Sequence, residues 1–448
     1  MVKYFSLLLI SGLLCCTTVV GQGWTLEQCI AYAWDNNINL QQWQLTTEQA
    51  SNNHFQSKMN FLPSVGLRAS ENMSWGMSTF QRTISDEEGN EQFFAVQERG
   101  FSHSFNPSIY ASIYIFEGLR KINTLRRSQS EYQAAQQDVE LQRNAISINV
   151  AQAYLQVLLS LEMLTVADSN YASTNAQLIR LKQLVAAGSR ALSEQLDMEA
   201  QLANAEVQRV TAQNNLDINY LILRQLLNLP STTAFKVATP LINIDDVSLQ
   251  QNDIGTIYAM AQNLPQIRGA EFRLQSAQHN LSIARADYWP TLSVSGAFGS
   301  VYYNSQVKSF WDQLTDHNNP TLNFTLTVPL FNNWRFHTNT KNARLNHRIA
   351  ELEVENKRQT LYKEIQTATT DALAAYNKFR AANRNVTASQ ESFRYVEQRF
   401  EAGSANPTDF EVARNNFLRA QSEELQAKYQ YIFQLKIIDL YKGLPIKL

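Results

Sequence analysis

The residues that could carry out catalysis or hold a metal ion are few in this chain, and their spacing suits neither task. None of the six histidines has a second histidine four positions away, as a helical zinc site needs, and no cysteine pair has zinc-site spacing. The 15 glycines form no loop of the kind that cradles phosphate. We therefore predict that the protein is not an enzyme and has no catalytic residue, cofactor or metal ion.

Two glycines have positions that indicate structure rather than chemistry. Residues 119–186 and 333–401 contain neither proline nor glycine, and both stretches carry apolar residues at helical spacing. Gly188 and Gly403 follow these stretches, as glycine does where a helix ends, and new helices are predicted to begin near Ser193 and Asn406. At about 1.5 Å per residue, each long helix would extend on the order of 100 Å before the chain turns back.

The N-terminus has the features of a secretory signal peptide. Lys3 precedes an apolar stretch that is too short to span a bilayer, and small residues follow as far as Gly21. Residues 1–21 are thus predicted to be removed, with lipidation at Cys15 or Cys16 as an alternative. We expect Cys29, the cysteine that is left, to be a small buried residue, and we expect no later segment to be apolar for long enough to span a membrane.

The two halves of the chain repeat each other. Residues 61–63 recur as residues 288–290, at an offset of 227 positions, whereas from residue 115 onward the offset is 215. We place the 12-residue difference in the polar stretch 81–100, which we predict to be a surface loop. Ordered matches with a single length difference indicate a duplication, with the first repeat over residues 22–230 and the second over residues 231–448.

Four short segments alternate between apolar and polar residues, which is the period of a half-buried β-strand. The clearest is 321–330, and the others lie near 65–75, 108–115 and 291–298. A soluble sheet gives the same alternation. Continuous apolar faces, small hydroxyls opposite them and aromatic residues at the strand ends favour strands of the outer membrane. Four strands cannot close a barrel, so we expect an oligomer.

These features together predict a mainly α-helical fold with a β-barrel contribution. Each of the two structural repeats would hold two transmembrane β-strands and long coiled-coil-like helices. A periplasmic coiled-coil scaffold without a transport role is an alternative, although a filament does not account for strands between the helices. The net charge of −2, with no basic stripe, predicts no nucleic-acid partner.

In the order and spacing of these motifs, the sequence resembles the outer membrane efflux protein family, the TolC-like channels. The matching features are Pro63 and Pro290 before the strands, residues 328–333 where a strand leads into a helix, and the two Ala-Gly-Ser turns. The resemblance covers essentially the whole exported chain. It implies a homotrimer with a twelve-stranded barrel in outer-membrane lipid and an α-helical periplasmic tunnel. It also implies two partners, a periplasmic adaptor protein and an inner-membrane transporter.

The resemblance also assigns roles to five residues. Four of them would form the tips that contact the adaptor, where the residue types alone indicate only helix ends: Gly188, Ser189, Gly403 and Ser404. Asp409 matches the first of two aspartates that ring the closed periplasmic entrance in the family, but Val412 stands at the second position. Because a carboxylate is favoured in the first turn of any helix, a local structural role for Asp409 is the alternative.

The function implied by the resemblance is that of an outer-membrane duct in a tripartite efflux system, which passively conducts substrates from the pump and adaptor to the exterior. Type I protein secretion uses the same kind of component and is the alternative. The sequence distinguishes neither the transported substrate nor the class of pump.

Overall fold

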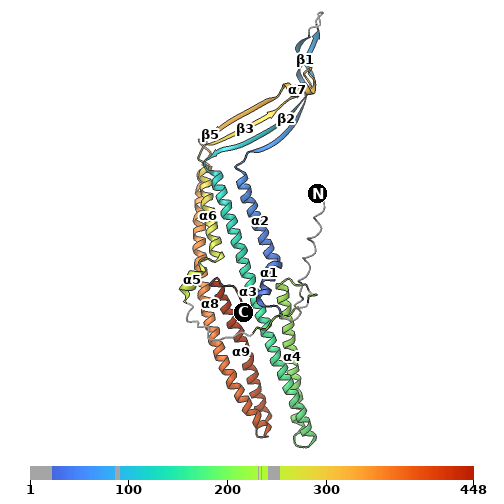
Figure 1. Cartoon of the computed structure of the whole chain (residues 1–448), viewed down its shortest axis with the longest axis vertical. Helices are drawn as coiled ribbons and strands as arrows, with labels where there is room; N and C mark the ends of the chain where they lie inside the picture. The colour runs from blue at the N-terminus through green and yellow to red at the C-terminus, as the bar shows by residue number, and fades with distance from the viewer. Residues whose placement is uncertain (1–22, 86–90, 231, 234, 241–252) are drawn as a thin grey trace, which may run out of the picture. The chain divides into compact units, whose positions relative to one another are not determined.

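The computed structural model divides the chain into two units, one helical and one that contains a β-sheet (Figure 1). It describes residues 23–85, 91–230, 232–233, 235–240 and 253–448. The helical unit comprises Met1–Gln44, Asp138–Pro265 and Arg358–Leu448, and the sheet unit comprises Leu45–Gln137 and Gln266–Lys357. The predicted signal peptide, with Cys15 and Cys16, lies outside the described residues.

The helices confirm that the chain is a twofold repeat. The first half contains α1 (Leu26–Asn36), α2 (Ile38–Met59), α3 (Arg120–Ala186) and α4 (Leu192–Leu226). The second half contains α5 (Ile254–Ala261), α6 (Pro265–Ala286), α8 (Arg335–Glu401) and α9 (Pro407–Tyr441). A shift of 227 positions converts the bounds of α2 into those of α6, and a shift of 215 converts α3 and α4 into α8 and α9. The bounds of the long helices and the starts of the returning helices are therefore predicted correctly to within two residues.

The repeat extends to the backbone conformation of the turns. The described residues with positive φ fall into four pairs at an offset of 215: Gly118 and Asn333, Leu119 and Trp334, Gly188 and Gly403, and Asn228 and Gly443. Left-handed backbone is strained for residues other than glycine, so its recurrence at equivalent places reflects one inherited set of turns. The division at residues 230 and 231 into two repeat domains stays a prediction.

The predicted strands form one antiparallel sheet. Its members are β1 (Ser64–Ser85), β2 (Glu91–Glu117), β3 (Thr291–Gly299) and β5 (Asn319–Thr327), in the order β1-β2-β3-β5 (Figure 1). A two-residue strand, β4 (Tyr302–Tyr303), pairs with β2, and the short helix α7 (Phe310–Asp316) lies between β4 and β5 in sequence. The strands β1 and β5 are the edges of the sheet, and each has one side without a partner strand in the described chain.

The prediction of a surface loop over residues 81–100 is wrong. β1 continues to Ser85 and β2 begins at Glu91, and the two strands pair in register up to Ser85 and Glu91. Residues 86–90 lie outside the described part of the chain. This stretch contains four apolar residues that favour extended backbone, Phe80, Ile84, Phe94 and Val96. Polar residues separate them along the sequence, and the high polar content led to the prediction of a loop.

The sheet has two chemically different faces. On the apolar face, Leu67 is 75% exposed and Phe324 is 67% exposed. The polar face carries small hydroxyl residues, and some of them bond across the strands, as in Ser64 with Ser112 at 2.9 Å between the Oγ atoms. A large apolar surface facing water is unfavourable, so this face must be covered by lipid or by protein.

The core of the helical unit forms around α3. Tyr154 is fully buried there, and its hydroxyl lies 3.0 Å from the Trp24 carbonyl oxygen and 2.7 Å from that of Ala238. Trp24 also forms a parallel bridge with Val237, which ties the start of the described chain to the segment after α4. Cys29 is fully buried in the same core, as expected, and burial raises the pKa of its thiol to about 12.

One described helix, α3, is long and apolar enough to cross a membrane by length and composition alone. This differs from the expectation that no segment after the leader reaches spanning length. The apolar residues of α3 have another use, because Val150, Tyr154, Val157 and Leu158 are buried in the core of the helical unit. A core helix satisfies the same length and composition criteria, so they do not argue for insertion.

Candidate functional site

The first predicted tip is a tight turn between α3 and α4. Gly188 has φ +74°, its N–H donates to the Val185 carbonyl, and the Ser189 N–H donates to the Leu184 carbonyl at 2.9 Å. This pair of bonds satisfies the last free carbonyls of α3 in the manner of a Schellman motif. A Cβ at Gly188 would meet no atom within 4 Å, so only the backbone conformation requires glycine here.

The second tip repeats this turn between α8 and α9. Gly403 has φ +73°, its N–H donates to the Phe400 carbonyl, and the Ser404 N–H donates to the Arg399 carbonyl at 2.8 Å. The Ser404 hydroxyl lies 3.1 Å from the same carbonyl, and the Arg399 guanidinium donates to the Ser404 carbonyl at 3.1 Å. The second tip is therefore fastened by side chains as well as by backbone.

Arg190, just after the first tip, reaches the second one. Its guanidinium lies 5.9 Å from the centre of the Phe400 ring, and its Nη2 would be 3.8 Å from a Cβ at Gly403. Arg180 of α3 forms an ion pair with Glu401 of α8 at 3.0 Å. The structure thus brings the four predicted tip residues into one region. Their role in adaptor binding stays a prediction.

Asp409 lies in the first turn of α9, as predicted. Its backbone N–H donates to Asn406 Oδ1 at 2.7 Å, so Asn406 is the N-cap of the helix. The Asp409 side chain is exposed, and so is Val412, at 55%. The cap uses only the backbone of Asp409, which leaves its carboxylate available for another role, and the gate stays a prediction.

The next turn of α9 after Asp409 holds a buried ion pair, Glu411 with Arg414, that the sequence did not predict. Arg414 is 5% exposed, lies 3.3 Å from Glu411, and donates to Thr174 Oγ1 of α3 at 3.1 Å. Burial raises the pKa of Glu411 and lowers that of Arg414, although each charge favours the other. The desolvation of both groups therefore outweighs their mutual attraction.

A second polar cluster joins α3 to α9 farther from the tips. Glu162 accepts hydrogen bonds from Lys428 Nζ at 3.0 Å and from the Tyr429 hydroxyl at 2.7 Å. Burial raises the pKa of Glu424, repulsion from Glu162 raises it further, and Lys428 opposes the shift. Both clusters depend on which faces of α3 and α9 meet, and helical spacing alone does not specify that.

An open groove of about 890 Å³ runs between α3, α4 and α9. Amide and hydroxyl side chains supply many of its polar atoms, including Asn170, Asn215, Asn219 and Asn415. Within the described residues, no group of three His, Cys, Asp or Glu side chains could hold a metal ion. The tips and this groove therefore offer surfaces for contact with water, solutes or protein.

Comparison with known proteins agrees with this architecture. CusC, whose crystal structures describe conformational changes that accompany folding and transmembrane channel formation, superimposes on this chain with a TM-score of 0.79 at 17% identity. The superposition covers 94% of this chain and 92% of the CusC chain. An antiparallel sheet joined to two pairs of long helices is thus a fold that this chain shares with CusC.

The sequence comparisons identify the family. The model of the outer membrane efflux protein family matches residues 30–229 and 256–439, and the chain belongs to that family. The pyoverdine export outer membrane protein OpmQ of Pseudomonas putida is 26% identical over 435 residues, which cover 94% of this chain and 85% of OpmQ. The outer membrane protein OprJ of Pseudomonas aeruginosa is 24% identical over 441 residues, 94% of this chain and 83% of OprJ. The chain is accordingly an outer-membrane protein, as the sequence predicted.

Proposed function

We propose that the chain is the outer-membrane duct of a tripartite efflux system, and that it conducts substrates passively as a homotrimer. The observation that carries this proposal is the sheet with two free edges, one exposed apolar face and one polar face. Three such sheets, joined β5 to β1, give a twelve-stranded barrel. Closure pairs the free edges, places the apolar face in lipid and lines the lumen with hydroxyls.

The helices would continue this barrel into the periplasm as a tunnel. Three copies of the paired helices α3 with α4 and α8 with α9 would form its wall, and the tips would meet the adaptor at Gly188, Ser189, Gly403 and Ser404. No nucleotide-binding loop is evident in the sequence, so energy would come from an inner-membrane transporter. The pyoverdine export protein among the relatives supports efflux as the function of the duct.

The first test is biochemical. Detergent extracts of the outer membrane should give a trimer band on unheated gels that collapses to the monomer on boiling. A protein found only as a water-soluble monomer in the periplasmic fraction would instead support a scaffold and contradict the duct.

The second test is genetic. Deletion of the chain should raise susceptibility to some dyes, bile salts, antibiotics or metal ions. Loss of extracellular protein with unchanged susceptibility would assign the duct to type I secretion and refute the efflux proposal.

A further inference from the structure

The β1–β2 hairpin bends sharply toward the polar face of the sheet. Ser74 and Ser78 are four positions apart on β1, about 13 Å along a regular strand. Yet the Ser102 Oγ atom lies 2.7 Å from Ser74 Oγ and 3.1 Å from Ser78 Oγ. Two hydroxyls can meet a third in this way only if the strand folds between them with its polar face on the inside.

The bend falls where two glycines oppose each other. Gly76 of β1 pairs with Gly100 of β2, so neither strand carries a side chain at this position. A Cβ at Gly100 would lie 3.1 Å from the Phe80 ring, which covers this glycine from beyond the bend. Paired glycines permit a bend that side chains on the inner face would obstruct.

The apolar residues change faces across this glycine pair. Before the bend, Met73, Trp75 and Phe101 lie on the apolar face of the sheet, opposite Ser74 and Ser102. Beyond it, the pairing continues without a register shift, so alternate residues still mark the two faces. The face that continues the polar side now carries Phe80, Ile84, Phe94 and Val96, together with the ion pair of Arg82 and Glu98.

We call the paired residues 77–84 and 92–99 the arm, and the face with Phe80 and Phe94 its inner face. The opposite, outer face carries mainly polar residues, Thr79, Gln81, Thr83 and Gln97, with Met77, Phe93 and Ala95 as the apolar exceptions. On the inner face, Ile84 is 58% exposed, Phe94 is 41% exposed and Val96 is 39% exposed. The arm thus exposes apolar surface on the side that lipid cannot cover.

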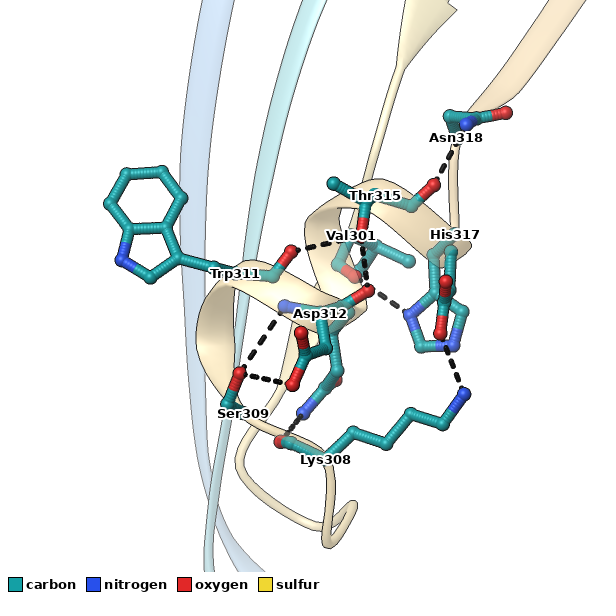
Figure 2. A network of polar contacts seen from close by, with 10 residues as sticks. Val301, Lys308, Ser309, Trp311, Asp312, Thr315, His317 and Asn318 are labelled. Carbon is teal, nitrogen blue, oxygen red and sulfur yellow. Dashed lines mark hydrogen bonds and ion pairs between the residues drawn. The ribbon is translucent and has the colours of Figure 1, made fainter.

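A loop from the second repeat braces the arm after the bend. The Gln81 N–H donates to the Ser305 carbonyl at 2.8 Å, in the segment between β4 and α7. Figure 2 shows the polar network that holds this segment, in which Lys308 pairs with Asp316 at 2.6 Å and Ser309 caps α7. Fully buried Gln313 adds a hydrogen bond to the Lys308 carbonyl at 2.7 Å. The arm is therefore held in its bent position within one chain.

We propose that the inner faces of three arms meet over the outer mouth of the barrel and form an apolar constriction there. This inference rests on the proposed trimer. The polar face of each sheet faces the barrel axis in that trimer, and the bend directs each arm toward the same axis. The inner face of each arm therefore packs against the arms of the other two chains, which the threefold symmetry of the trimer places around the same axis. The outer face, on which polar residues predominate, is left toward the medium.

The test measures access to the lumen from outside the cell. In the full-length trimer, Ser108→Cys places a thiol on the polar face below the bend, and a bulky, membrane-impermeant maleimide is added to intact cells. The labelling should be slow with native arms. It should rise by about tenfold or more in Phe80→Ser/Phe94→Ser, because the loss of two apolar rings weakens the contact between arms.

Phe93→Ser is the matched control, since it removes the neighbouring ring from the outer face and should leave the labelling slow. Ile84→Cys should in addition form disulfide-linked dimers of sibling chains on mild oxidation. Rapid labelling with native arms, equal rates in the two serine variants, or no cross-link in an intact trimer would overturn the constriction. Absence of the trimer band on unheated gels would instead refute the proposed function itself.

Discussion

Arg414 of α9 donates to the Thr174 hydroxyl of α3 across 3.1 Å, and both residues are almost completely buried. The contact joins the long helix of the first repeat to the returning helix of the second. Arg414 also forms a desolvated ion pair with Glu411. Both residues lie in α9, the helix that carries Asp409. This arrangement connects the packing near the tips to the candidate entrance.

Removal of the arginine alone should loosen the start of α9. Arg414→Met leaves the Glu411 carboxylate buried without its cation, which costs about 3–5 kcal/mol for a buried pair. The measurement is hydrogen exchange at the backbone amides of residues 410–415. The double variant Glu411→Gln/Arg414→Met should recover the lost protection or exceed it, because it removes both desolvated charges. An unstable double variant would show that the pair is stabilising.

The stability of the contact between α3 and α9 should also fall as pH rises, through Glu424. Its pKa in the folded protein is raised above the ordinary value of 4.5, chiefly by burial, so the folded state binds the proton more tightly. The loss of folding stability from burying the ionised Glu424 carboxylate is absent below pH 4.5 and complete above the raised pKa. Glu424→Gln should therefore raise the thermal midpoint at pH 7.5 and leave it unchanged at pH 4. The same gain at both pH values would contradict this assignment.

The tip glycines should be required for their backbone conformation. Gly188→Ala and Gly403→Ala place a Cβ on left-handed backbone, at a cost of about 1–2 kcal/mol each. Ser189→Ala is the control, since the bond to α3 uses the backbone N–H of Ser189 and survives. Local opening measured by hydrogen exchange should increase only in the glycine variants. If the tips also bind the adaptor, its affinity should fall in parallel.

Periodicity was sufficient to locate the helices, because proline and glycine are absent between residues 119 and 186 and a glycine marks the end. The duplication added a second copy of every such signal. The bent arm was missed because Phe80, Ile84, Phe94 and Val96 alternate with polar residues on both strands, and the bend depends on the register that opposes Gly76 to Gly100. The pair of Glu411 and Arg414 was missed because its burial depends on a contact 240 residues away.

Asp409 should act at the entrance through its carboxylate and not through the helix cap. Asp409→Asn keeps the backbone bond to Asn406 and should abolish block of the single-channel current by cations, if three such carboxylates converge. Asn406→Ala is the converse variant, since it weakens the helix by about 1 kcal/mol and keeps the carboxylates. Unchanged cation block in Asp409→Asn would remove this residue from the gate.

The long β1–β2 hairpin has no equal in the second repeat, where β3 and β5 span nine residues each. In the trimer that we propose, the pairs of long helices therefore recur six times around the channel, whereas the arm recurs only three times. The extracellular end of the proposed channel therefore has threefold symmetry, whereas its periplasmic end has approximate sixfold symmetry. An antibody against the arm would accordingly saturate at three copies per channel.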